Sequence, residues 1–229
     1  MTSGASPGGR GWLLPLLAIA LVLRVACALA VTRAAGDRRF LFPDSGAYDA
    51  LARGLVEEGR YGTPGARAAW PPGYPALLAA VYAFGGGAPA ARLLQALLGT
   101  ATAWIGARIA MGIAGPGAAA SRAGFYAAVF LAIWPHGIAY GGLILTETFA
   151  VFLLALTAWG LAAGSIPPRR AAGAGASAGL LALVRPSLIL LGPLMAFVWA
   201  WGRSRGGCSP RTALAAFLAQ RGLHPYRLP

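Results

Sequence analysis

The sequence predicts an all-α, polytopic membrane protein with five or six transmembrane helices, because it is apolar, weakly charged and divided into runs of membrane length. Hydrophobic residues make up 58% of the 229 positions and charged residues only 11%, too few for the surface of a soluble protein. The net charge is +13, but the arginines are scattered singly, without a basic run or an aromatic platform. Composition therefore excludes a soluble enzyme, a nucleic-acid-binding module and a disordered tail.

The first span is expected at residues 12–32, after a Gly- and Ser-rich cytoplasmic tail at residues 1–11. This run rises roughly 31 Å at 1.5 Å per residue, which is enough to cross a bilayer. The alternative is a cleaved signal peptide, since Ala28-Leu29-Ala30 fits a small-residue cleavage site. Arg24 inside the run and the further spans favour an uncleaved helix.

The number of spans depends on one ambiguous stretch. Uncharged stretches follow at residues 68–91, 93–107, 123–146, 148–168, 171–184 and 186–202. The first of them begins with three prolines, which disfavour a helix there. If residues 68–91 crossed the membrane, the short loops with Arg108, Arg122, Arg169 and Arg170 would be external, against the positive-inside rule. If this stretch lies at the interface instead, every short loop obeys the rule. Residues 34–91 are therefore predicted to be one external loop of a membrane domain at residues 12–202.

This external loop is predicted to carry an amphipathic helix on the membrane surface. Apolar side chains recur there at helical spacing, and an acid–base–acid row lies on another face: Tyr48, Leu51, Ala52 and Leu55 against Asp49, Arg53 and Glu57. In this topology all six carboxylates of the chain lie on one side of the membrane.

The end of the membrane domain is predicted to be two short helices. Residues 171–202 are too many for one perpendicular span, and Arg185-Pro186 interrupts them. Two short helices that meet there return a polar tail, residues 203–229, to the cytoplasm. Gly175 and Gly179 have the spacing of a helix-packing GxxxG pair.

Two carboxylates are candidates for chemistry. Asp44 follows the first span closely and could act as a general base toward a hydroxyl or an amine, or could be an ordinary helix N-cap. Glu147 is the single charge between Arg122 and Arg169; with Thr146 as N-cap, a structural role at a helix start is about as plausible as a functional one.

Arginines and aromatic residues are the candidates for binding. Arg24 and Arg185 are charges within apolar segments. Each could bind a lipid phosphate, could pair with a carboxylate such as Asp44 or Glu147, or could snorkel to the membrane surface. Arg92 at an outer helix end could snorkel or lie over a phosphate. Trp70 and Tyr74 fit an interfacial aromatic belt, with sugar stacking as the second interpretation.

The order of these segments resembles a known superfamily. The segments are FPDSGAYDALARGLVEEGRYG, WPPGYPALLAAVYAFGG, then Arg92, YGGLILTE and GLLALVRPSLILLGP. Over residues 12–202 the chain resembles the N-terminal half of the polyprenyl-phosphate-sugar glycosyltransferases of the C structural class, which include protein O-mannosyltransferases and lipid A aminoarabinose transferase.

This resemblance implies a multi-pass inner-membrane enzyme that transfers a sugar, with inversion, from a polyprenyl-phosphate carrier to a lipid, glycan or protein acceptor on the external face. The catalytic carboxylate of the family falls on Asp44 and its second external acid on Glu147. Arg24, Arg92 or Arg185 would bind the phosphate. Some relatives use a divalent metal, which these two acids could hold, although the sequence requires none.

The chain departs from the family in length, since members are usually about twice as long, and residues 203–229 lack the continuing spans. A truncated or frameshifted product is one explanation. Two other classes remain open: a small transporter of an anionic solute and a non-catalytic membrane assembly subunit. A transporter is expected to break helices in both halves, and the sequence indicates one break, at Arg185-Pro186.

Overall fold

The computed structural model describes residues 10–35, 42–63, 66–67, 70–162, 168–191, 193–194, 197 and 201, and this part of the chain is helical apart from one small hairpin. The longer elements are α1 (Leu13–Ala35), α4 (Ala88–Ala114), α5 (Ala118–Ile133), α6 (Pro135–Gly142), α7 (Glu147–Leu161) and α8 (Pro168–Val184). Between α1 and α4 lie α2 (Pro43–Glu58), α3 (Gly73–Ala83) and the antiparallel pair β1 (Gly62–Thr63) and β2 (Ala66–Arg67). Short 3-10 turns are η1 (Arg10–Trp12) and η2 (Pro186–Leu188). The predicted all-α fold class is confirmed.

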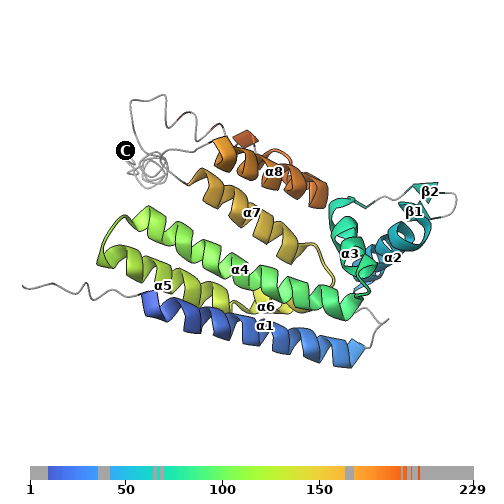
Figure 1. The fold of residues 1–229 in the computed structure, drawn as a ribbon, viewed down its shortest axis with the longest axis horizontal. Helices are drawn as coiled ribbons and strands as arrows, with labels where there is room; N and C mark the ends of the chain where they lie inside the picture. The colour runs from blue at the N-terminus through green and yellow to red at the C-terminus, as the bar shows by residue number, and fades with distance from the viewer. Residues whose placement is uncertain are drawn as a thin grey trace, which may run out of the picture.

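The longer helices lie side by side in one bundle, with α2, α3 and the hairpin at one end (Figure 1). Helix α4 is central and contacts α1, α5, α6 and α7, while α8 packs on α7. Residues 1–9 of the predicted N-terminal tail and the whole predicted tail at 203–229 lie outside the described residues.

Carboxylates collect at one end of this bundle, which also carries arginines such as Arg53, Arg92 and Arg185. The acidic end, where α1 ends and α4 and α7 begin, carries Asp44, Asp49, Glu57, Glu58 and Glu147, while Asp37 lies outside the described residues. The basic end, where α4 ends and α5 and α8 begin, carries Arg108, Arg122, Arg169 and Arg170. The carboxylates therefore do collect at one end, as the topology required; which side of the membrane that end faces stays a prediction.

Helix α3 does not run from one end of the bundle to the other. The last turn of α1 and the first turns of α4 are joined directly, because Arg92 Nη1 donates a hydrogen bond to Thr32 Oγ1 at 3.2 Å. The chain thus leaves and re-enters the bundle at the acidic end. With 11 residues α3 is only about 16 Å long. This agrees with the predicted interfacial position of the proline-rich segment.

Two of the described helices, α1 and α4, are long and apolar enough to cross a membrane, or three if the bent pair α5 and α6 counts as one span. That pair is bent by 47° at Pro135, a break that we did not expect within residues 123–146. Helix α7 is apolar but has only 15 residues. The larger number of five or six spans stays a prediction.

The main apolar core lies at the acidic end and joins α2 and α3 to the bundle. It includes Tyr74, Leu78, Ile144, Phe149 and Val184. Helix α3 begins close to the end of α8, and a Cβ on Gly73 would lie 2.8 Å from the carbonyl carbon of Leu183, so a glycine is needed at this contact. By contrast, a Cβ on Gly175 or Gly179 would meet nothing within 4 Å, so the GxxxG pair makes no close helix contact within the described part of the chain.

Candidate functional site

Charged groups at the acidic end act on the pKa of Tyr48, a buried residue of α2. Its ring packs edge-on against Trp70 and Tyr74, with centroids 5.3 and 5.1 Å away. Burial and the negative charges of Asp44 and Glu147 raise the pKa of Tyr48, while Thr146 and Arg185 partly offset this rise. We call Asp44, Tyr48, Thr146, Glu147 and Arg185 the Tyr48 cluster.

Glu147 and Arg185 form the ion pair of this cluster. Arg185 Nη2 donates to Glu147 Oε1 at 2.8 Å, and both side chains are partly exposed. Glu147 is the first residue of α7, where the helix dipole favours a carboxylate. Arg185 has extended backbone angles because it precedes Pro186, which ends α8 at the predicted break. The alternative in which Arg185 binds a carboxylate is therefore the one found.

The two helix caps considered from the sequence, Asp44 and Thr146, have different outcomes. Asp44 is not the N-cap of α2: the cap position is Phe42, and Asp44 lies in the first turn with its side chain exposed. Pro43 sets this boundary because its fixed φ suits the first helical position. Thr146 does occupy the N-cap position of α7, but its hydroxyl makes no capping hydrogen bond. Asp44 is therefore open to a ligand from solvent.

Arg92 and Tyr74 are buried rather than interfacial. Arg92 is 2% exposed, so the snorkelling interpretation is wrong, and one of its partners is Thr32. Tyr74 is fully buried, which leaves no ring face for a sugar. Its hydroxyl donates to Gln95 Oε1 at 2.9 Å, and Gln95 Nε2 donates to the carbonyls of Gly141 and Leu143. Trp70, at 36% exposure, keeps an accessible surface beside Tyr48.

The predicted acid–base row on α2 is partly a buried network. Asp49 accepts hydrogen bonds from Arg53 Nε at 2.9 Å and from Tyr82 Oη at 2.6 Å, so two members of the row pair with each other. The Arg53 guanidinium also lies 5.2 Å from the Tyr82 ring centroid. Burial and the Asp49 carboxylate raise the pKa of Tyr82. This network holds α2 on α3, while Glu57 is exposed.

Arg24 lies away from the Tyr48 hydroxyl, in the middle of α1. It is 2% exposed and donates hydrogen bonds to the carbonyls of Ala20, Leu131 and Ala132 at 3.1, 2.6 and 3.1 Å. Pro135 explains these partners, because it has no N–H for the carbonyl four residues before it. Snorkelling is therefore wrong for Arg24, and its contacts are backbone carbonyls rather than either candidate acid.

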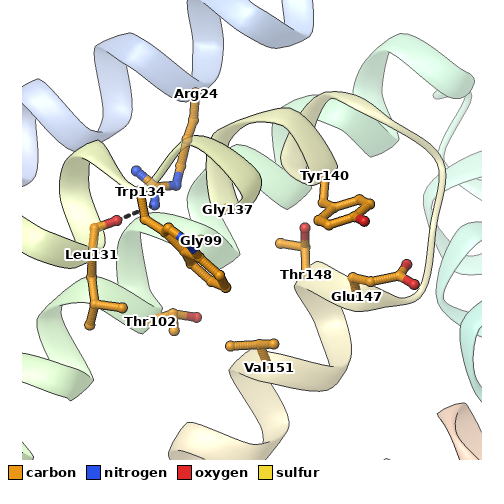
Figure 2. A pocket seen from close by; sticks show the side chains of 10 residues that line it. All are labelled: Arg24, Gly99, Thr102, Leu131, Trp134, Gly137, Tyr140, Glu147, Thr148 and Val151. Atoms are coloured by element: carbon orange, nitrogen blue, oxygen red, sulfur yellow. Dashed lines mark hydrogen bonds between the residues drawn. The ribbon is translucent and has the colours of Figure 1, made fainter.

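A cavity of about 130 Å³ nevertheless links Arg24 to Glu147, which line it from opposite sides (Figure 2). Its remaining walls are largely apolar and come from α4, α5, α6 and α7: Gly99, Thr102, Leu131, Trp134, Gly137, Tyr140, Thr148 and Val151. The cavity thus begins beside the Tyr48 cluster and extends toward the middle of the bundle.

Sequence reasoning missed the central position of Tyr48 and the role of Gln95. Tyr48 counted only as part of the apolar face of α2. Gln95 had a signal, since it is an amide in the otherwise apolar run at residues 93–98. Its partners are carbonyls about 46 residues away in the chain, and no sequence pattern identifies those.

A divalent metal finds little support at the acidic end. Within the described residues, no three His, Cys, Asp or Glu side chains come together. Glu147 has its charge paired with Arg185, so a cation would have to displace this arginine. We therefore derive no chemical step through a metal.

No protein-family model, curated protein or solved structure matches the chain. The resemblance to polyprenyl-phosphate-sugar glycosyltransferases thus stays a prediction from the order of segments. The chemistry of the Tyr48 cluster is the remaining guide to function.

Proposed function

We propose that the chain acts as a multi-pass glycosyltransferase of the inner membrane, moving a sugar from a polyprenyl-phosphate carrier to an acceptor on the external face. The observation that carries this proposal is the Glu147–Arg185 ion pair at the same end of the bundle as the exposed carboxylate of Asp44. Transfer from a sugar phosphate needs a base for the acceptor and positive charge for the departing phosphate. The cluster offers both kinds of group at one end of a membrane bundle.

The charge distribution supports an external site. The basic end carries four arginines in or near short connections, and such residues favour the cytoplasmic side. The acidic end, which holds the Tyr48 cluster, then faces outward. A lipid-linked sugar whose carrier lies in the outer leaflet would reach Asp44 at the membrane surface.

In the proposed reaction Asp44 is the general base. Its carboxylate takes the proton of the acceptor hydroxyl while the acceptor oxygen forms a bond to the anomeric carbon. The bond from this carbon to the phosphate oxygen breaks, and the phosphate leaves with the electron pair. Attack opposite the leaving group inverts the configuration. The exposure of Asp44 supports this role because an acceptor can approach its carboxylate directly.

Arg185 is the best candidate for the phosphate among the three arginines considered. Its side chain is 44% exposed, whereas Arg24 and Arg92 are each 2% exposed. Glu147 then acts as a positioning residue that orients Arg185 by their ion pair. Trp70 adds an exposed indole next to Tyr48, where a sugar ring could stack.

The test is sugar transfer from a polyprenyl-phosphate donor in proteoliposomes by Asp44→Asn. Loss of a general base lowers the rate by about 10² to 10⁴-fold. Glu57→Gln, which removes one exposed negative charge from the same helix, is the matched control and should transfer normally. Expression and thermal stability of both variants should stay near those of the parent. Normal transfer by Asp44→Asn would refute the base assignment.

Transport of an anionic solute is the second candidate, and one observation favours it. The unexpected bend at Pro135 adds a second helix break to the one at Arg185-Pro186, and broken helices line the solute sites of many transporters. Anion flux into proteoliposomes that Asp44→Asn leaves unchanged, together with absent sugar transfer, would favour this candidate over the transferase.

A further inference from the structure

The cavity beside Arg24 lies at the depth of the middle of a membrane span. Arg24 is 11 residues from each end of α1, since α1 runs from residue 13 to residue 35, and is therefore about 16 Å from either end. Thr102 of α4 and Leu131 of α5 line the same part of the cavity. A charge at this depth is costly and usually has a partner.

The charge of Arg24 is not neutralised by its known contacts. Its guanidinium donates to three backbone carbonyls, which satisfy hydrogen bonds but carry no net charge. None of the ion pairs in the described part of the chain includes Arg24. Glu147 is the acid that lines the cavity, and its carboxylate pairs with Arg185 at 2.8 Å. Counted together with Arg185, the partner of Glu147, the charged groups at the cavity have a net charge of +1.

Hydrogen-bond donors also predominate around the cavity. Three buried polar atoms of the lining residues have no hydrogen-bond partner among the described residues: Arg24 Nε and Thr148 Oγ1, which can donate, and Glu147 Oε2, which accepts. Helix α6 begins at Pro135, so the N–H groups of His136 and Gly137 lie in a first turn, where no intrahelical acceptor exists. The Thr102 hydroxyl already donates to the Leu98 carbonyl at 2.8 Å.

We propose that this cavity binds a small monovalent anion, of which a halide is the simplest example, next to Arg24. Its volume of about 130 Å³ is roughly that of four water molecules, so one small anion with a few waters fits. An alkyl chain would leave the Arg24 and Thr148 donors unpaired, and water alone would leave the charge uncompensated. A multiply charged anion is excluded by the desolvation cost within largely apolar walls.

Trp134, whose indole forms one wall of the cavity, can report on the anion (Figure 2). The experiment uses the full chain in nanodiscs with every other tryptophan changed to Phe. Sodium bromide replaces sodium gluconate at constant ionic strength, and Trp134 fluorescence is recorded. Bromide should quench in a saturable manner, whereas neutral acrylamide should quench linearly. A parallel variant that keeps only Trp104, which packs against Trp159 and does not line the cavity, should show no saturation.

Two substitutions in the Trp134 reporter locate the site. Arg24→Gln should abolish saturation. Thr148→Val should weaken the apparent affinity about fivefold, the effect of one hydrogen bond. Thr148→Val should fold normally, because the Thr148 hydroxyl has no hydrogen-bond partner to lose among the described residues. A weaker affinity in this variant therefore reports on the site and not on folding. Arg122→Gln, at the basic end, is the control for net charge and should bind bromide normally.

Three results would overturn the proposal: linear bromide quenching that parallels acrylamide, no quenching by either, or saturation that persists unchanged in Thr148→Val. The inference does not rest on glycosyl transfer. Saturable bromide binding in a chain that transfers no sugar would support the anion site and refute the proposed activity. Sugar transfer by a chain that shows no saturable bromide binding would support the activity and refute the anion site.

Discussion

Arg24 and Arg185 each form hydrogen bonds next to a helix break that a proline causes, but they lie at different depths and have different partners. Arg185 directly precedes Pro186 at the acidic end, is partly exposed and binds the Glu147 carboxylate. Arg24 lies in the middle of α1, is buried and binds carbonyls at the break before Pro135. The difference teaches that an arginine deep in the bundle repairs backbone hydrogen bonding, whereas one at its end presents charge.

The break before Pro135 shows why a buried arginine is needed there. Pro135 leaves the Leu131 carbonyl without its helical N–H partner, and Trp134 turns to φ −59° and ψ 114°, the extended region preferred before proline. Water is absent from the bilayer core, so such carbonyls must be satisfied by protein groups. The guanidinium fits because Gly99 leaves room for it: a Cβ there would lie 2.7 Å from Arg24 Nε.

The largest expected effect on stability is that of Arg24→Leu. It leaves the Leu131 and Ala132 carbonyls without their donors, at about 1–3 kcal/mol each, although removal of a buried charge offsets part of this. We expect a net loss of about 3 kcal/mol, measured as the unfolding midpoint in SDS titrations. Val22→Leu, an exposed position on the same helix, is the control. A loss no larger than that of Arg185→Leu would erase the contrast between the two arginines.

Gln95→Leu tests whether backbone repair needs a charge. Gln95 is neutral, yet it donates to the carbonyls of Gly141 and Leu143 at the end of α6, as Arg24 does at the end of α5. The substitution also removes the acceptor of the Tyr74 hydroxyl, so we expect a loss of about 2 kcal/mol in the same assay. Leu97→Ala, at an exposed position of α4, should change stability much less. Equal losses of stability in Gln95→Leu and Leu97→Ala would count against a role of Gln95 in backbone hydrogen bonding.

The sequence predicted the features that depend on composition and local pattern. Hydropathy indicated the helical bundle, the arginine distribution indicated that the chain returns to the acidic end before α4, and Pro186 indicated the break after α8. Positive charge in short loops and the missing N–H of proline act locally, so they can be read without knowing the contacts.

The remaining features depend on contacts between distant segments. Arg24 is more than 100 residues from Leu131, and its carbonyl partners carry no side-chain signature. Asp44 was a possible cap because acidic residues often cap helices, but Pro43 starts the helix two residues earlier than a cap at Asp44 would. The pairing of Glu147 with Arg185 was one of several alternatives, and only the packing of α7 on α8 selects it.

A smaller effect should appear at high pH within the acidic end. Burial and Asp49 raise the pKa of Tyr82 above the value near 10 of an unfolded tyrosine, so the folded state holds this proton more tightly. Its contribution to stability is complete below pH 10 and is lost as the pH rises through the folded-state pKa. Tyr82→Phe should lower stability by about 1 kcal/mol at pH 7 and reduce the alkaline loss. An unchanged alkaline slope would assign that loss to Tyr48, Tyr61 or Tyr74, whose pKa values are also raised.

The smallest expected effect is the coupling between Glu147 and Arg185, which completes the comparison with Arg24. Their side chains are 28% and 44% exposed, so solvent screens the pair, and exposed ion pairs contribute about 0.2–1 kcal/mol. A double-mutant cycle with Glu147→Gln and Arg185→Gln in the SDS assay should give a coupling within that range, and the coupling should fall at high salt. Sugar transfer should respond far more strongly, because Arg185→Gln removes the charge proposed to meet the phosphate. Coupling of several kcal/mol would mean that the pair is buried in the membrane like Arg24. It would then be a structural contact, and the phosphate would need a different cation.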